Sequence, residues 1–144
     1  MSGIGNIFSG MRTASSGLSA ERARIDVIAN NIANSQVTRT PDGGGAFRRK
    51  IVSFKPLPQK VENGRLQGGG VYVSSITPDY VTPMELLNEP EHPDANEDGI
   101  VEYPNINSVR EMADMMTAIR AYEANLKAQE VFMRMAQKSL EMLR

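Results

Sequence analysis

The sequence contains no cysteine and no tryptophan, and only 6% of its 144 residues are aromatic. Without cysteine, neither a disulfide framework nor a thiolate metal site can form. Sixteen basic and seventeen acidic residues give a net charge of −1, which argues against a nucleic-acid binder that depends on releasing phosphate counterions. No apolar run reaches the roughly 18 residues of a membrane-spanning helix. The length is close to that of one domain.

Histidine is almost absent as well. His92 is the only one, so neither a Ser-His-Asp triad nor a histidine-based zinc site can be assembled. A pair of carboxylates is the one catalytic arrangement left open, and no pattern places such a pair in a pocket. We therefore expect no enzymatic activity, no catalytic residues, no cofactor and no metal site. Residues 1–18 have neither a basic start nor a long apolar stretch, so we also expect no cleaved secretory signal.

Proline is missing from both ends, since all eight prolines lie between Pro41 and Pro104. Because proline breaks helix interiors, both ends are free to form long helices and the middle is not. Net charge follows the same division: +2 for residues 1–40, −4 for 41–107 and +1 for 108–144. We predict an N-terminal helix in 1–40, a small β/loop domain over 41–107 and a C-terminal helix in 108–144.

Both ends carry apolar residues at seven-residue intervals. The N-terminal row is Ile4, Met11, Leu18, Ile25 and Ile32, and the C-terminal row is Met112, Ile119, Leu126, Met133 and Leu140. Such spacing is typical of coiled-coil helices. We predict an α+β protein whose terminal helices pair as a coiled coil beside a β-rich middle. The predicted intrasubunit helix seam consists of Leu18, Ile25, Ile32, Ile119, Leu126 and Met133. Residues 108–111 fit a capping box that opens the second helix.

The middle segment predicts two strands, over residues 47–57 and 71–76, with loops at the glycine triplets 43–45 and 68–70. Asn63-Gly64 predicts a turn between them. The basic run 48–50 has two interpretations that the residues leave open. It can protect a strand edge from unwanted pairing, or it can meet an acidic partner.

An acidic stretch follows, with seven carboxylates and no Lys or Arg in residues 85–102. Asp94, Asn96 and Asp98 fit the first ligand positions of an EF-hand loop, but the twelfth position is Asn105 instead of glutamate. Flanking prolines also oppose the usual helices. We favour a series of Asx turns over a cation site. A cytosolic coiled-coil adaptor with a calcium-binding acidic loop is kept as the alternative function, and a carboxylate-dependent hydrolase as a third.

The run 27–34 holds three asparagines, Asn30, Asn31 and Asn34. Asn30 and Asn34 are neighbours on the helix face away from the predicted seam. Two interpretations remain open: a helix end fraying toward Pro41, or amide contacts to another subunit.

At these residues the chain resembles the N-terminal part of bacterial flagellar rod and hook proteins, over Ser16–Asn34. Further segments, in the correct order, resemble the proximal-rod subtype of this family: 38–41, 47–49, 92–96, 98–99, 103–105, 111–112 and 120–125. Two places depart from it. Ile100 stands where the family often has an aromatic residue, and 35–37 replaces a small-polar, Thr-rich run.

The resemblance implies a structural subunit of the proximal rod in the flagellar basal body, part of a drive shaft that crosses the periplasm and transmits torque for motility. It implies an inner domain of paired terminal helices and an outer β domain. It also implies unfolded passage through the flagellar type III export apparatus, without a cleaved signal. The implied partners are other proximal and distal rod proteins, the rod's junction protein and the basal membrane ring, in a multi-subunit helical assembly. We expect Asn30, Asn31 and Asn34 to contact neighbouring subunits.

Overall fold

The computed structural model describes the chain from residue 2 to residue 142, except residues 59, 63–64 and 68. The chain forms two compact units. The helix unit comprises Met1–Ile25, Ser53–Ser75 and Thr117–Arg144, and the network unit comprises Asp26–Val52 and Ile76–Met116. The division into domains 1–40, 41–107 and 108–144 stays a prediction.

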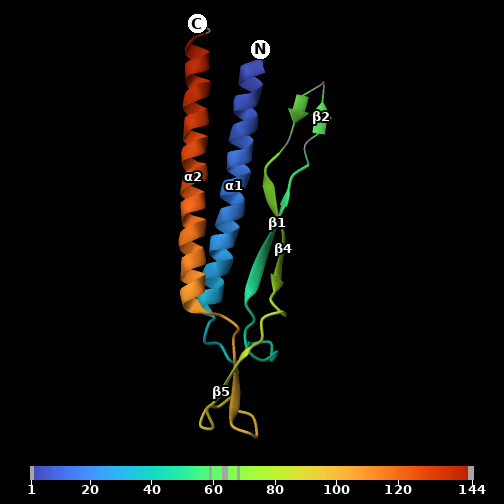
Figure 1. Ribbon diagram of the computed structural model, residues 1–144, viewed down its shortest axis with the longest axis vertical. Coiled ribbons are helices and arrows are strands. Elements are labelled where there is room, and N and C mark those ends of the chain that lie inside the picture. Colours follow the sequence, from blue (N-terminus) through green and yellow to red (C-terminus); the bar gives the residue numbers. More distant parts are fainter. Residues whose placement is uncertain (1, 59, 63–64, 68, 143–144) are drawn as a thin grey trace. The chain divides into compact units, whose positions relative to one another are not determined.

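Two long helices hold most of the regular structure, α1 (Ser2–Ala33) and α2 (Ser108–Glu141) (Figure 1). The predicted helices at both ends are therefore confirmed. Neither helix contains proline, and α2 is rich in Ala, Glu, Lys, Gln and Met, all strong helix formers. Among the residues that the structure describes, neither helix is long and apolar enough to cross a membrane.

The start of α2 differs from the predicted capping box. Asn107 is the cap: its side-chain Oδ1 accepts a hydrogen bond from the Arg110 N–H at 3.0 Å, and its carbonyl accepts one from Glu111 N at 2.9 Å. Asparagine is as good an N-cap as serine. The Glu111 carboxylate does not reach back to the cap because it bonds side chains elsewhere in the network unit.

In the helix unit the two helices lie antiparallel and in contact. A Cβ added at Gly10 would lie 2.5 Å from the Phe132 ring, and one added at Gly17 would lie 2.9 Å from the Asn125 amide. The two pairs are seven residues apart on each helix. Glycines on α1 thus make room for larger side chains of α2. Ala14, Ala20 and Ala118 are buried in the same unit. The pairing as a coiled coil stays a prediction.

The strands pair two by two in the described part of the chain. β1 (Lys50–Pro56) pairs with β4 (Val71–Pro78), β2 (Lys60–Glu62) with β3 (Arg65–Gln67), and β5 (Glu85–Asn88) with β6 (Ile100–Tyr103). The second and third pairs are antiparallel. The first and last elements are helices and the middle is β-structure, so the fold is α+β. The predicted strands are confirmed, whereas the predicted turn at 63–64 lies outside the described residues.

One polar contact joins β4 to α1 within the helix unit. The Val71 N–H donates to Ser16 Oγ at 3.1 Å, and the neighbouring Gly70 has a positive φ of 111°. A Cβ at Gly70 would collide with the Ser16 side chain, so glycine is required there for both conformation and space.

Candidate functional site: a buried polar network and exposed helix faces

Asn31, near the end of α1, lies at the centre of the network unit and is only 1% exposed. Its Nδ2 donates to the Lys50 carbonyl and its Oδ1 accepts from the Lys50 N–H, both at 2.9 Å. The side-chain amide therefore satisfies both backbone groups of the first residue of β1, as a neighbouring strand would. A buried backbone group left unpaired costs free energy, so this pair fixes where β1 begins.

The same amide also reaches α2. Asn31 Nδ2 donates to Glu111 Oε2 at 3.0 Å, and Arg49 Nε donates to Glu111 Oε1 at 2.7 Å. Glu111 is 1% exposed, and Arg49 also lies 3.7 Å from the Asp114 carboxylate. A buried carboxylate is stable only when its charge is paired and its oxygens are hydrogen-bonded. Both conditions are met here.

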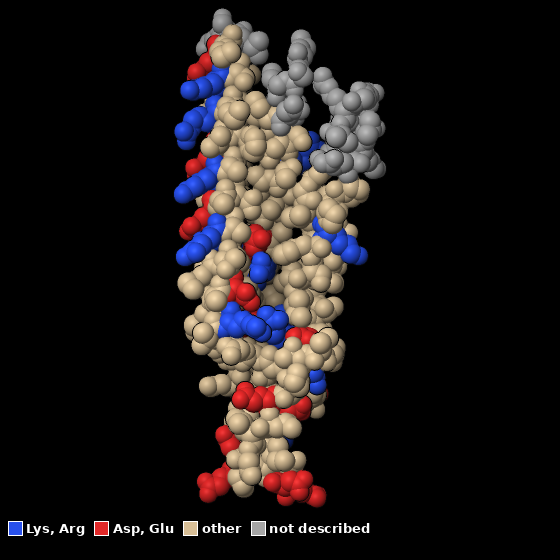
Figure 2. Space-filling view, in the orientation of Figure 1, with Lys and Arg blue, Asp and Glu red and all other residues tan. Residues whose placement is uncertain are grey.

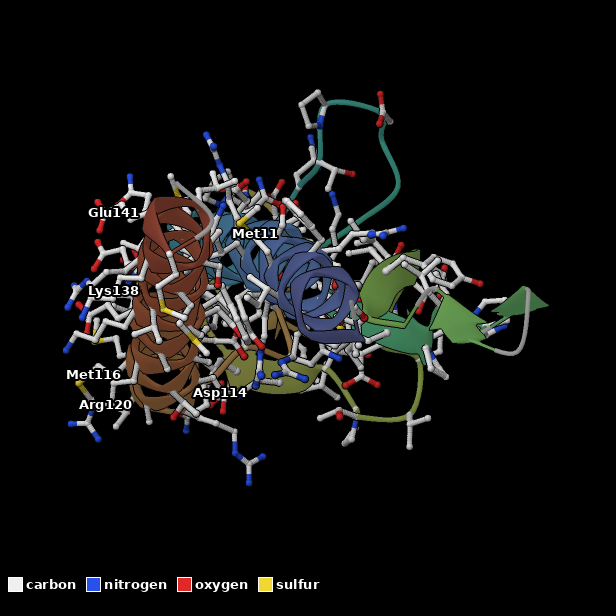
Figure 3. All side chains as sticks on the ribbon, turned by 90° about the horizontal axis from the view of Figure 1, so that it is seen from above. Met11, Asp114, Met116, Arg120, Lys138 and Glu141 are labelled. Atoms are coloured by element: carbon white, nitrogen blue, oxygen red, sulfur yellow. The ribbon has the colours of Figure 1, made fainter. Side chains whose placement is uncertain are left out.

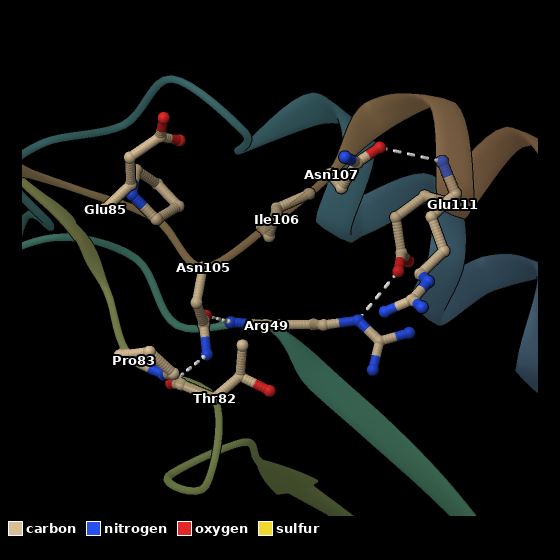
Figure 4. Close-up of a pocket in the computed structure, with 10 residues that line it drawn as sticks. Arg49, Thr82, Pro83, Glu85, Asn105, Ile106, Asn107 and Glu111 are labelled. Carbon is tan, nitrogen blue, oxygen red and sulfur yellow. Dashed lines mark hydrogen bonds and ion pairs between the residues drawn. The ribbon is translucent and has the colours of Figure 1, made fainter.

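A second buried amide extends the network. Asn105 Oδ1 accepts from the Arg49 N–H at 2.8 Å, and its Nδ2 donates to the Asp79 and Thr82 carbonyls at 3.1 and 3.0 Å. These three hydrogen bonds hold the β1 entry and the 79–82 turn together. Figure 4 draws those that join Asn105 to Arg49 and to Thr82. We call this set the Arg49 network; it consists of Asn31, Arg49, Asp79, Thr82, Asn105 and Glu111.

Asp79 closes the turn. Its carboxylate accepts hydrogen bonds from the Thr82 hydroxyl at 2.7 Å and from the Thr82 and Val81 N–H groups. The hydrogen bonds from Thr82 in the first place, and the nearby Arg49 charge in a smaller measure, lower the pKa of Asp79 below its ordinary value of 3.8, although burial opposes them. Hydrogen bonds to the charged form favour that form.

A cleft of about 240 Å³ lies beside the Arg49 network, between the 82–85 segment and the start of α2 (Figure 4). Its polar lining consists of Arg49, Thr82, Asn105 and Glu111 of the Arg49 network together with Glu85, Asn107 and Arg110. In the described residues no three His, Asp or Glu side chains gather in a way that could hold a metal ion.

The acidic loop is held by contacts within the network unit. Asp94 accepts from the Thr38 hydroxyl at 2.7 Å and pairs with Arg39 at 2.8 Å. Asn96 Oδ1 accepts from the Asp98 and Ile100 N–H groups, and Gly99 has a φ of 74°. This is the Asx-turn arrangement that the sequence favours, and no observation supports the calcium alternative.

The predicted subunit-contact asparagines have different surroundings. The Asn31 side chain is buried and bonds Lys50 and Glu111 of its own chain. Asn34 Nδ2 donates to the Asn30 carbonyl at 2.7 Å, one turn back on α1, and the Asn30 side chain is exposed. Their role in subunit contacts stays a prediction; Asn30 is exposed, Asn34 is half-buried and Asn31 is buried.

The six predicted seam residues divide by helix. On α1, Leu18, Ile25 and Ile32 are half-buried. On α2, Ile119, Leu126 and Met133 are 40%, 43% and 51% exposed. The side chains that face inward on α2 lie one residue earlier, at Ala118, Asn125 and Phe132. The seam assignment stays a prediction, and the single chain leaves its α2 half uncovered.

The outer face of α2 is charged. Figure 2 shows blue and red side chains alternating along it, and in Figure 3 Arg120, Lys138 and Glu141 project on the side away from α1.

Each residue of the basic run 48–50 has a partner within the network unit. Arg49 belongs to the network, the Arg48 guanidinium lies 5.1 Å from the Tyr80 ring centre and the Lys50 ammonium 5.4 Å from that of Phe47. Neither sequence interpretation of this run includes Arg49 as the partner of a buried glutamate.

Two family models match the chain. Residues 11–39 match "Flagella basal body rod protein", and residues 97–142 match "Flagellar basal body rod FlgEFG protein C-terminal". The two matched segments contain Asn31 and Glu111, which meet in the Arg49 network.

Curated relatives share the name flagellar basal-body rod protein FlgC. The protein from Borreliella burgdorferi is 46% identical over 83% of this chain and 86% of its own length. The protein from Bacillus subtilis is 35% identical over 93% of this chain and 96% of its own, and that from Aquifex aeolicus is 39% identical over 85% and 87%. The similarity therefore extends over nearly the whole of each protein.

Proposed function

This chain belongs to the FlgC family of flagellar basal-body rod proteins and is a structural subunit of the rod, and we propose that it assembles by packing its terminal helices against those of neighbouring subunits. The single observation that carries this proposal is the exposed apolar row on α2. Ile119, Leu126, Met133 and Leu140 are 40–67% exposed at seven-residue intervals. Monomeric proteins rarely expose a contiguous apolar surface of this kind.

Helix packing suits the mechanical task. Each subunit contributes two helices of 32 and 34 residues, so many side-chain contacts act in parallel when neighbours cover them. The free energy of each contact is small, but their sum resists the shear that a rotating shaft experiences. In the assembled rod, α1 and α2 are then a coiled coil with Leu18, Ile25 and Ile32 in its seam. Asn30 and Asn34 lie at the contact with the next subunit.

The family membership supports a finer proposal for the location of the subunit. We place the subunit in the proximal rod, within the periplasmic space, next to other rod proteins and the basal membrane ring. It reaches that position through the flagellar type III export apparatus. This role is structural, so the protein has no catalytic function.

The substitution Leu126→Asp tests the helix-packing proposal. Because Leu126 is already 43% exposed, an aspartate there leaves the folded chain intact but places a charge in the contact with the neighbouring helix. We expect normal expression and helix content by circular dichroism, with loss of the subunit from isolated basal bodies and loss of swimming in a strain lacking the native gene. Leu126→Met keeps the apolar contact and is the matched control. Normal swimming with Leu126→Asp would refute helix packing through this row.

A further inference from the structure

Charge is divided between the two units far more sharply than along the sequence. The helix unit contains eleven basic and five acidic residues, a net charge of +6. The network unit contains five basic and twelve acidic residues, a net charge of −7. A nearly neutral chain thus consists of two oppositely charged bodies. Opposite potentials attract two copies of one chain when the acidic unit of one meets the basic unit of another.

The helix unit offers a groove for such a contact. A hollow of about 500 Å³ is lined by Phe8, Met11, Arg12 and Ser15 of α1 and by Gln129 of α2. Phe8 is 49% exposed. The groove therefore presents the apolar side chains of Phe8 and Met11 beside the polar Arg12, Ser15 and Gln129.

The groove is also basic on its α1 side. Arg12 is in the wall and exposed, and Arg22 lies on the same side of α1, with exposed Ser15 and Ser19 between them. No acidic residue shares this side of α1 between positions 12 and 22. Basic and acidic residues alternate on α2, so the positive charge at the groove comes from α1.

The network unit presents the complementary surface on the β5–β6 hairpin. Leu86 is 65% exposed, and its cross-strand partner is Glu102, which is exposed as well. Leu87, on the opposite face, pairs with the fully buried Val101. The outward face of the hairpin therefore combines an apolar side chain with a carboxylate. Figure 2 shows red carboxylate side chains gathered around this part of the network unit.

We propose that the β5–β6 hairpin of one copy, through Leu86 and Glu102, docks into the Phe8–Arg12–Gln129 groove of a second copy of this chain. An apolar centre with oppositely charged groups at its rim is the usual composition of a specific interface. The two surfaces differ, so the contact is heterologous, and each added copy leaves a free groove and a free hairpin. The proposal rests on the rod function and names one of the contacts that build the rod.

Charge reversal in trans tests this contact. Sedimentation velocity of the purified full chain is expected to show association at about 50 mM salt that weakens at about 500 mM, because exposed charges are screened. Arg12→Glu alone and Glu102→Arg alone should each weaken association about tenfold. An equimolar mixture of the two variants should restore it, since every groove then finds a hairpin of opposite charge. Lys138→Glu and Asp42→Arg change the same net charges outside the groove and the hairpin and are the matched controls.

The outcomes separate a docking site from general attraction. Equal weakening by Arg12→Glu and Lys138→Glu, or no rescue in the mixture, would show that net charge alone acts and would overturn the docking site. Salt-independent association, or a chain that stays monomeric at about 100 μM, would overturn it as well. Swimming separates this failure from failure of the rod function. If Arg12→Glu cells swim normally and Leu126→Asp cells do not, the rod function stands and the hairpin contact does not.

Discussion

Different kinds of interaction stabilise the two units of this chain internally. In the helix unit, glycines of α1 let Phe132 and Asn125 of α2 approach closely, and the contact is one of shape. In the network unit, Glu111 and Asn31 are buried and bond Arg49 and the backbone of Lys50. A shape contact loses stability when a side chain becomes too large for its space, whereas a buried charged network loses stability when one partner is removed and the other is left unpaired. The network unit therefore fixes where the chain segments meet, and the helix unit leaves surface for neighbours.

The largest expected effect breaks the network. Glu111→Ala leaves Arg49 and the Asn31 amide without their shared partner, and removing one member of a buried ion pair typically costs about 3–5 kcal/mol. We expect a loss of stability near the lower end of this range, because Arg49 is partly exposed and keeps Asp114 within 3.7 Å. Urea unfolding followed by circular dichroism measures it. Glu111→Gln keeps the shape and one hydrogen bond, so it should cost less. Equal losses for both variants would contradict a role for the charge.

An intermediate effect is expected from the helix contact. Gly10→Ala places a methyl group 2.5 Å from the Phe132 ring, and overpacking of this kind costs about 1–3 kcal/mol. The gain in helix propensity, roughly 1 kcal/mol, offsets part of it. Gly17→Ala is the matched control, since its methyl group meets the end of the flexible Asn125 side chain. We expect thermal unfolding to show destabilisation for Gly10→Ala and little change for Gly17→Ala. In a Phe132→Ala background, Gly10→Ala should no longer destabilise the chain.

The smallest effect is a dependence on pH. The lowered pKa of Asp79 means that its carboxylate stabilises the folded chain at any pH above its unfolded value near 3.8. That contribution is lost as the pH falls through the lower folded value. Comparing urea midpoints of the native chain and Asp79→Asn from pH 6 to pH 2 should show the native chain ahead at pH 6 and the gap narrowing below pH 4. If the difference between the two urea midpoints grew below pH 4, the pKa of Asp79 would be raised in the folded chain and not lowered.

The helices and strands follow from the sequence because proline and glycine act locally. Pro41 and Pro104 bound a middle that cannot be helical, and alternation between residues 50 and 56 favours a strand. The sequence places the cap of α2 one residue late, because Asn107 and Ser108 are equally good caps and only the bonds of Glu111 distinguish them. Local helix propensity does not include the bonds of the Glu111 carboxylate to residues of other elements.

Hydrophobic periodicity favours the row of Ile119, Leu126 and Met133 as the inner face of α2. In the single chain, the side chains of Ala118, Asn125 and Phe132 face inward, and the last two meet glycines of α1.

The Arg49 network cannot be predicted from the sequence either. In the sequence, Arg49 stands out only as part of a basic run, and a run of charges gives no sign that one member lies beside a buried glutamate.

The hydrogen bond between Asn31 and Glu111 joins residues 80 positions apart, so it closes one large loop that contains the whole β region. The entropy lost in closing a loop grows only with the logarithm of its length, and doubling the length adds about 0.6 kcal/mol. Residues inserted into the exposed 41–45 turn or the 96–98 turn therefore change the free energy of closure very little. A residue inserted directly after Asn31 or directly before Lys50 shifts the strand, so that the Asn31 amide bonds different backbone groups. The middle of this chain can vary in size through evolution while both ends of the loop remain fixed.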